Sequence, residues 1–268
     1  MRLSNIFGAD TKERLKKILY KVKNRDFKPY VVDRVLYGTE FKFYVANKDG
    51  EDWYEPALDK NGEWVWPEMK FMKDHICKNG DVVIECGAHH GLTAVVASKW
   101  VGAEGHIYCF EPNPENLAIL HKNLGLNGVT NVTVIPKAVG SAAGTIKISN
   151  SSSNSHVLKG KEHVGVDVDV VRIDDYAYVN PVAIKIDVEG FETDVLKGAA
   201  DILKSKPKLM IELHPDMIER YGSAMDELLS LIDKSYKVWV QWDIYKAPEP
   251  YDRLRPISDR AHLFAVPK

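Results

Sequence analysis

The chain has 268 residues, 45% of them apolar, which is enough for one large domain or for one domain with a small extension. The formal net charge of −2 is unevenly distributed: residues 1–30 hold nine Lys or Arg against three acids, so the remainder carries about −8. An acidic body of this kind excludes a protein that wraps nucleic acid, and we expect no nucleic-acid partner.

No run of 18 or more apolar residues is present, and the start Met-Arg-Leu-Ser-Asn lacks the apolar core of a signal peptide. We therefore expect a soluble, cytoplasmic protein without a transmembrane segment. The three cysteines, Cys77, Cys86 and Cys109, form no CxxC pair, which argues against a disulfide framework and against a zinc site. Cys86 and Cys109 fall at predicted strand ends, where we expect small buried thiols.

The first predicted element is a helix over residues 12–23. Leu15, Ile18, Leu19 and Val22 recur there at helical spacing, and most of the lysines lie off that face. A basic amphipathic helix of this kind packs on its own domain or on a partner subunit, or it makes a weak contact with a membrane surface or an anionic substrate. The pattern leaves these alternatives open, and with them a homo-oligomer.

Residues 41–66 alternate in polarity, with turn signals at Lys48-Asp49-Gly50 and Lys60-Asn61-Gly62. This pattern predicts a strand-rich flap that carries Trp53, Tyr54, Trp64 and Trp66. Such a flap covers a functional site or simply covers a sheet. We expect residues 1–70 to form an extension made of the basic helix and this flap, ahead of a main domain over residues 71–268.

From residue 81 onward, short apolar runs alternate with helix-length segments, which is typical of a mostly parallel sheet covered by helices on both faces. The expected strands are 81–86, 106–110, 131–136, 145–149, 166–173, 182–186, 208–213, 236–242 and 261–266. The expected helices are 92–101, 114–124, 191–204 and 217–233, the second of them capped by Asn113. In the polar, Ser-rich stretch that includes Asn154, Ser155 and His156, we favour a flexible surface loop over one that hydrogen-bonds a polyol.

The loop Glu85-Cys86-Gly87-Ala88-His89-His90-Gly91 joins the first strand of this domain to its first helix. A glycine-rich turn at this position lets the backbone approach a ligand and aims helix N–H groups at it. The dinucleotide fingerprint G-x-G-x-x-G lacks its middle glycine here, and no Gly-Lys-Ser/Thr follows as a P-loop requires. The carboxylate of Glu85 suits the ammonium group of a ligand with a methionine tail.

Glu111 closes the second strand 20 residues after Gly91, where a carboxylate accepts hydrogen bonds from both hydroxyls of a ribose. An NAD-binding protein uses an acid at the same place, so Glu111 indicates a nucleoside site without selecting the cofactor. We expect His89 and His90 to shape the loop rather than to act as a base.

A second polar cluster follows the expected strand at 182–186. Asp187 and Glu189 lie at the carboxyl edge of this strand, before Gly190 turns the chain into a helix. In an open α/β sheet, this edge is where ligands bind. On spacing alone, a functional pair of carboxylates and a solvated turn are equally good interpretations.

The segment from Lys185 to Ala199 resembles the KIDVEGxExxVLKGA stretch of the FkbM-type methyltransferases. Further segments match in the family's order, and they are Val82–Gly91, Phe110–Pro114, Asn123–Asn127, Lys137–Gly140 and Ile211–Pro215. The resemblance covers residues 80–215 well and the two ends poorly. The family typically opens its cofactor loop as DVGANxG, so Glu85, Cys86 and His89 are departures from its pattern.

The resemblance implies a class I methyltransferase (Rossmann-like) fold, with a seven-stranded, mostly parallel sheet and an antiparallel final strand. It also implies S-adenosyl-L-methionine as the cofactor of residues 71–268, and O-methylation of a hydroxyl on a sugar, a glycan or another small-molecule acceptor. The cofactor-binding residues are then expected to be Glu85, Gly87, Ala88, His89, Gly91, Glu111, Pro112, Ala138 and Asp187.

Methyl transfer to a hydroxyl needs a group that takes the hydroxyl proton. Asp187, Glu189 and His214 are the candidates at the carboxyl edge of the sheet, and His214 has the ordinary pKa closest to neutrality. The sequence does not choose among them. The same three residues are of types that a divalent ion uses, but no spacing demands an ion, and we expect no required metal.

Other functions remain as alternatives. A noncatalytic cofactor-binding or regulatory module is one, in which Glu85 and His89 mark a decayed site. A methyltransferase that acts on protein or nucleic acid is another, although no basic-aromatic stripe supports RNA. An NAD-dependent oxidoreductase is disfavoured by the missing glycine.

Overall fold

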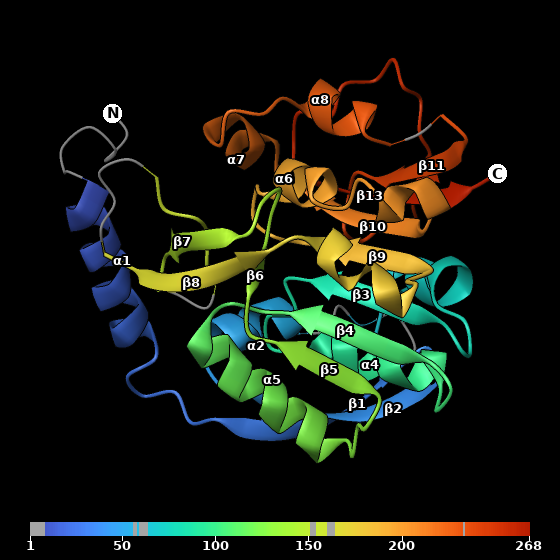
Figure 1. Cartoon of the computed structure of the whole chain (residues 1–268). Helices are drawn as coiled ribbons and strands as arrows, with labels where there is room; N and C mark the ends of the chain where they lie inside the picture. Colours follow the sequence, from blue (N-terminus) through green and yellow to red (C-terminus); the bar gives the residue numbers. More distant parts are fainter. Residues whose placement is uncertain (1–8, 56–57, 59–63, 151–153, 160–163, 233) are drawn as a thin grey trace.

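A computed structural model of the chain describes residues 9–55, 58, 64–150, 154–159, 164–232 and 234–268, and its centre is an eight-stranded sheet (Figure 1). In spatial order the strands are β12 (Glu249–Pro250), β11 (Tyr236–Gln241), β13 (Ala261–Pro267), β10 (Lys208–Leu213), β9 (Ala183–Ile186), β3 (Val82–Cys86), β4 (His106–Phe110) and β5 (Val132–Ile135). β10, β9, β3, β4 and β5 are parallel, whereas β13 is antiparallel to both of its neighbours. Apart from the two-residue β12, this is the predicted seven-stranded sheet with an antiparallel final strand, and the predicted fold class is confirmed.

The sheet is buried on both faces. Helices α4 (Leu92–Val101) and α5 (Pro114–Leu126) cover one face, and α6 (Glu192–Lys197), α7 (Pro215–Arg220) and α8 (Met225–Ser230) cover the other. Successive residues of one strand therefore enter different cores: Val83 packs in the core beneath α4, and Ile84 in the core beneath α6. Burial on both faces explains why the strands are almost continuously apolar, and why Cys86 and Cys109 are buried thiols, as predicted.

Two predicted helices are interrupted at glycines. The helix expected over 191–204 stops at Lys197, and a separate 3-10 helix, η4 (Ile202–Ser205), follows. A Cβ atom at Gly198 would lie 2.0 Å from the carbonyl oxygen of Gly140, so only glycine fits at position 198, where the chain passes the backbone of Gly140. The helix expected over 217–233 is divided into α7 and α8 near Gly222, whose φ of +85° ends the first of them.

A small sheet of three strands, β6 (Ala138–Val139), β8 (Val166–Val171) and β7 (Gly144–Ile148), stands apart from the main one. Two of these are the strands expected at 145–149 and 166–173, and the latter gives way to a 3-10 helix, η3 (Ile173–Val179). The small sheet lies on the side toward which β3 and β4 point (Figure 1). The middle of the Ser-rich stretch, residues 151–153, lies outside the described residues, so the flexible loop stays a prediction.

The N-terminal extension contains a hairpin and a set of short helices. β1 (Tyr30–Leu36) pairs with β2 (Thr39–Val45), and α2 (Lys48–Tyr54), α3 (Pro67–Phe71) and the π-helix η2 (Met72–Ile76) follow. The prediction of a strand-rich flap over 41–66 is wrong at α2, because the Asn47 side chain caps a helix there by accepting from the Gly50 backbone N–H at 2.7 Å. Trp53 and Tyr54 therefore lie on a helix. The turn expected at Lys60-Asn61-Gly62 lies outside the described residues.

Helix α1 (Ala9–Lys23) confirms the predicted basic helix, but its apolar face points to solvent. Leu15, Ile18, Leu19 and Val22 are 47% to 64% exposed, so this face does not pack on the described part of the domain. Lysines attach the helix instead: Lys17 Nζ donates to Asn150 Oδ1 at 3.2 Å, and Lys23 Nζ pairs with Asp49 at 2.6 Å. Among the described residues, no helix is both long enough and apolar enough to cross a membrane.

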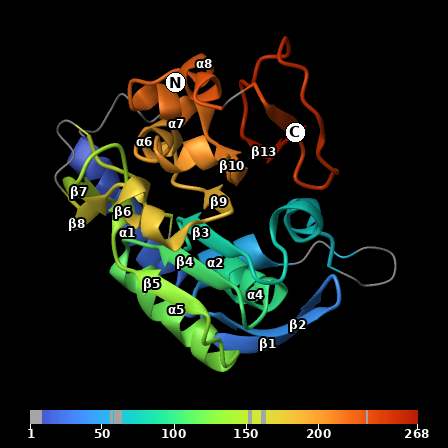
Figure 2. The ribbon, with the colours of Figure 1, turned by 45° about the vertical axis from the view of Figure 1, so that its right-hand side comes forward.

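The β1-β2 hairpin lies alongside α4 and α5 (Figure 1 and Figure 2). Two amide side chains, Asn123 of α5 and Asn127 at the C-terminal cap of this helix, bind the free edge of β2. Asn123 Oδ1 accepts from the backbone N–H of Tyr44 at 2.7 Å, and Asn127 accepts from the N–H of Lys42 at 2.9 Å and donates to its carbonyl at 2.7 Å. Asn123 also donates to the carbonyl oxygen of His90 at 2.9 Å, so the same side chain links the hairpin to the glycine-rich loop.

Candidate active site

A cavity of about 550 Å³ lies at the carboxyl ends of the parallel strands. Most of the residues expected to form the site line it together, and these are Glu85, Gly87, Ala88, His89, Glu111, Pro112, Ala138, Asp187 and Glu189. His214 and Gly91 are not part of the lining. The extension contributes to the same cavity through α2 and through Trp64 and Trp66. The topology thus joins segments that are distant in sequence into one pocket.

The glycine-rich loop adopts left-handed backbone conformations at three positions. Gly87 has a φ of +84°, and a Cβ atom there would lie 1.8 Å from the carbonyl oxygen of Asp187, so glycine is required for the close approach of the two loops. His89 has a φ of +51°, and Gly91, with a φ of +81°, leads into α4. Histidine and asparagine are both enriched in this conformation among non-glycine residues, so a histidine is tolerated at position 89.

Glu85 is almost completely buried, with 2% of its surface exposed. Neither carboxylate oxygen accepts a hydrogen bond from the described residues, and Lys185 Nζ lies 3.6 Å from Oε1. Burial raises the pKa of Glu85 in spite of this lysine. A buried carboxylate at the cavity wall with unused acceptor positions fits the ammonium group of a methionine tail.

Glu111 ends β4 and holds the glycine-rich loop. Its Oε2 accepts from the backbone N–H of His89 at 2.7 Å, and its Oε1 accepts from the N–H of Asn113 at 2.8 Å and from Asn116 Nδ2 at 3.3 Å. Burial raises the pKa of Glu111 to about 7, although these donors oppose the shift. Oε2 has a second lone pair, so Glu111 can organise the loop and still accept from a ribose hydroxyl.

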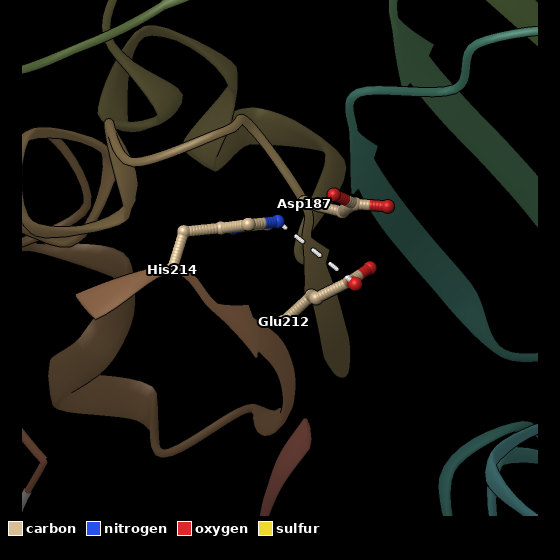
Figure 3. A group of neighbouring side chains, drawn as sticks. All are labelled: Asp187, Glu212 and His214. Carbon is tan, nitrogen blue, oxygen red and sulfur yellow. Dashed lines mark ion pairs between the residues drawn. The ribbon is translucent and has the colours of Figure 1, made fainter. Parts of the chain in front are cut away.

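His214 lies beneath the pocket, at the end of β10, among carboxylates. Its Nδ1 is 2.9 Å from Glu192 Oε1, and its Nε2 is 3.6 Å from Glu189 and 3.9 Å from Glu212 (Figure 3). Burial opposes a charge on the ring, but the carboxylates of Glu192 and Glu189 outweigh it and raise the pKa of His214 to about 9. At neutral pH the imidazole is therefore protonated, and in that form it cannot accept a proton.

Asp187 and Glu189, the other two candidate bases, both line the pocket wall. Burial and the nearby charge of Glu212 raise the pKa of Asp187 to about 8, and Lys185 Nζ lies 3.5 Å from its Oδ2. Burial also raises the pKa of Glu189, although the nearby charge of His214 acts to lower it. The backbone of Glu189 has a φ of +52°, a left-handed conformation that costs a non-glycine residue about 1–3 kcal/mol and that clusters at functional sites.

Four further ionisable residues of this site, Glu68, Glu212, Arg260 and His262, were not predicted from the sequence. Arg260 forms an ion pair with Glu212, and His262 Nε2 lies 2.8 Å from Glu68 Oε2 and 3.5 Å from Glu212 Oε2. The one sequence feature that could have indicated them is His262, because a histidine inside the apolar run Ala261–Pro267 indicates a polar group buried in the sheet.

Aromatic residues of the extension cover the glycine-rich loop. Tyr54 Oη lies 2.6 Å from His89 Nδ1, and the rings of Trp53 and His89 are 5.3 Å apart. His89 also stacks on His90, with ring centroids 3.9 Å apart, and burial lowers the pKa of His90 to about 4. Both histidines thus pack against aromatic rings at this loop, and residues of the extension line the pocket.

A model of the Methyltransferase FkbM domain matches residues 85–238, more than half of the chain. The hexuronic acid methyltransferase AglP of Haloferax volcanii is 28% identical over 150 residues, which cover 50% of this chain and 56% of AglP. A protein-L-isoaspartate O-methyltransferase of Fervidobacterium nodosum is 41% identical over 58 residues, which cover 22% of this chain and 29% of that enzyme. The chain thus spans little more than half the length of AglP.

Among solved structures, methyltransferase FkbM from Methylobacillus flagellatus is similar to this chain, with a TM-score of 0.47 and 22% sequence identity. The similarity covers 69% of this chain and 43% of that one.

Proposed function

Because this chain belongs to the FkbM methyltransferase family, we propose that it is an enzyme that transfers a methyl group from S-adenosyl-L-methionine to a hydroxyl of a sugar, a glycan or a similar small molecule. The observation that carries the proposal is the cavity of about 550 Å³, in which the glycine-rich loop meets two candidate bases, Asp187 and Glu189. Its volume is in the range of pockets that bind small molecules.

The residues of the pocket fit S-adenosyl-L-methionine. The unused acceptor positions of Glu85 match the ammonium group of the methionine tail, and Oε2 of Glu111 matches a ribose hydroxyl. Pro112 and Ala138 give apolar contacts suited to the adenine ring. Glu85 is one methylene longer than the family's Asp, and its carboxylate lies 3.6 Å from Lys185 Nζ.

The sulfonium of the cofactor supplies an activated methyl group. The protein must hold the acceptor oxygen in line with the S–CH3 bond, exclude water and remove the hydroxyl proton. Tyr54, Trp64 and Trp66 of the extension line the cavity and limit the access of water to it. The N-terminal extension therefore takes part in the reaction by enclosing the substrates.

We assign the proton-accepting role to Glu189. Asp187 Oδ2 lies 3.5 Å from the ammonium group of Lys185, whereas Glu189 Oε2 lies 3.6 Å from the imidazole of His214. His214, fixed by Glu192 on its other side, packs beside the Glu189 carboxylate and limits its rotation. The pKa of Glu189 is raised by burial, and this makes its carboxylate a better base than an exposed one. Asp187 then orients the acceptor hydroxyl.

A sugar acceptor is supported by two observations. The similar AglP protein is a hexuronic acid methyltransferase. In this chain, Asn154, Ser155 and His156 line the cavity, and Asn113 Nδ2 donates to Ser155 Oγ at 2.5 Å, which holds the polar loop against the cofactor site. Amide and hydroxyl side chains of this kind hydrogen-bond polyols.

Helix α1 supports a weak contact with an anionic membrane surface. Its four exposed apolar residues form one stripe, and Arg14, Lys16 and Lys21 are exposed on the same helix. An apolar stripe flanked by positive charge is the pattern of helices that lie in the interface of anionic bilayers. Two like-charged copies of this helix would repel each other, so we favour the lipid surface over self-association.

The deciding experiment incubates the protein with S-adenosyl-L-methionine and a panel of hydroxylated acceptors, and follows the release of S-adenosylhomocysteine. We expect acceptor-dependent release, and a decrease of about 10² to 10⁴ in its rate for Glu189→Gln with unchanged cofactor affinity. Glu219→Gln, a change at an exposed acid, serves as the control. Tight cofactor binding without release for any acceptor would favour the noncatalytic alternative, and an active Glu189→Gln variant would remove the assignment of the base.

A further inference from the structure

We propose that Asp187, Glu212 and His214 bind a divalent cation of the first transition row, such as Mn²⁺ or Zn²⁺, at the floor of the pocket. Each offers one ligand atom, and these atoms lie within 4.8 Å of one another (Figure 3). Ligand atoms bound at about 2.1 Å to one ion lie roughly 3–4.2 Å apart. The 3.9 Å between His214 Nε2 and Glu212 Oε1 already falls in this range, and the Asp187 ligand atom lies no more than 4.8 Å from either of them.

His214 is oriented as a metal ligand. It is 8% exposed, and its Nε2 accepts or donates no hydrogen bond among the described residues, although it faces the two carboxylates. Its other nitrogen, Nδ1, lies 2.9 Å from Glu192, a fully buried carboxylate that in turn accepts from the backbone N–H of Gly190 at 2.8 Å. Metal-bound histidines are held in this way, with the second nitrogen donating to a carboxylate.

The charge around the cluster also favours a cation. The acids of the surrounding network are Glu68, Glu85, Asp187, Glu189, Glu192 and Glu212, and the facing cations are Lys185, Arg260 and, if it is counted as charged, His262. Binding of the ion would displace the protons of Asp187 and His214, and with Asp187 ionised and His214 neutral the acids exceed these cations by three charges. Such an excess is costly in a buried site, and a divalent ion offsets most of it.

The position of the cluster suits methyl transfer, and this part of the inference rests on the proposed function. Asp187 and Glu212 line the cavity, so an ion held by them would be accessible from the cavity. A hydroxyl bound to such an ion would be more acidic, and Glu189 would take its proton. The acceptor oxygen would then form its bond to the methyl carbon as the S–CH3 bond breaks, with S-adenosylhomocysteine as the leaving product.

The test uses the full chain, freed of metal by a chelator, and titrates it with Mn²⁺ under electron paramagnetic resonance, without cofactor or acceptor. We expect one Mn²⁺ per chain, with pulsed spectra that contain a nitrogen coupling from histidine. Glu192→Gln should weaken binding about 10- to 100-fold, as loss of an outer-shell partner does, and His214→Ala by more than about 100-fold. Asp216→Asn, at an exposed acid two residues from His214, should bind Mn²⁺ like the wild type.

Wild-type protein that binds no Mn²⁺, or binds it without a nitrogen coupling, overturns the proposal and requires no variant. Variants that bind Mn²⁺ as tightly as the wild type overturn it as well. Cofactor affinity, measured on each variant by calorimetry, reports whether the fold is intact. Because the metal titration contains no methyl donor, loss of methyl transfer and loss of the metal site are separate results.

Discussion

Glu85→Gln tests the cofactor site most directly, because it removes one charge with almost no change in volume. The carboxylate is 2% exposed, and its unused acceptor positions are the expected partners of the cofactor's ammonium group. A hydrogen bond to a charged group contributes about 1.5–3 kcal/mol. Its loss should therefore weaken the binding of S-adenosylhomocysteine, which has the same tail, by about 10- to 150-fold.

The assay is calorimetry with two ligands. S-Adenosylhomocysteine has the amino-acid tail, whereas 5′-methylthioadenosine keeps the nucleoside and lacks the tail. We expect the variant to lose affinity for the first ligand only. An equal loss for both would mean that Glu85 maintains the loop rather than binds the tail, and no loss for either would refute the placement of the ammonium group.

Three further predictions follow from the described contacts. The affinity for 5′-methylthioadenosine should rise as the pH increases through about 7, because Glu111 ionises there and becomes a better acceptor for ribose hydroxyls. Calorimetry from about pH 5.5 to about pH 8.5 should show the rise spread over roughly two pH units, and an affinity that does not change with pH contradicts the prediction. His89→Asn should retain cofactor affinity, whereas His89→Val should lose about 1–3 kcal/mol of unfolding free energy, because a β-branched residue is strained at a φ of +51°. Urea unfolding measures this loss, and a His89→Val variant as stable as the wild type would refute the argument. The double variant Ile18→Asp/Val22→Asp should no longer sediment with anionic vesicles. Leu254→Asp is the control, because Leu254 is 91% exposed and lies outside α1, and this variant should sediment like the wild type. If the double variant still binds vesicles, α1 is not the membrane contact.

Most of the main sheet could be predicted because each strand is buried on both faces and is therefore continuously apolar over a short length. The helix at α2 could not be predicted so easily, because its start, Lys48-Asp49-Gly50, has the composition of a turn, and only the cap from Asn47 distinguishes the two. Gly198 interrupts a helix for a reason that lies in another segment, the carbonyl of Gly140.

The site was predictable where its residues follow the strands in sequence, as Glu85, Glu111 and Asp187 do. Arg260 was not, because it meets Glu212 across 48 residues of chain and belongs to no motif. The alternation of inward and outward side chains along a strand does not predict which residues of two strands form an ion pair, because that depends on the register between β10 and β13. The protonation of His214 was also not predictable, because it depends on Glu192 and Glu189 and not on the ordinary pKa of histidine.

The amide side chains of Asn123 and Asn127 have a consequence for how this protein avoids aggregation. Residues four apart on a helix advance by about 6 Å, and alternate residues of a strand by about 6.7 Å, so one turn of α5 matches the backbone positions of Lys42 and Tyr44. The two side chains occupy the hydrogen-bonding edge that another molecule's strand would need in order to extend the hairpin. Replacing both with leucine would leave the backbone N–H groups of Lys42 and Tyr44 without these acceptors, and the altered protein should then self-associate more readily than the wild type, which light scattering would detect.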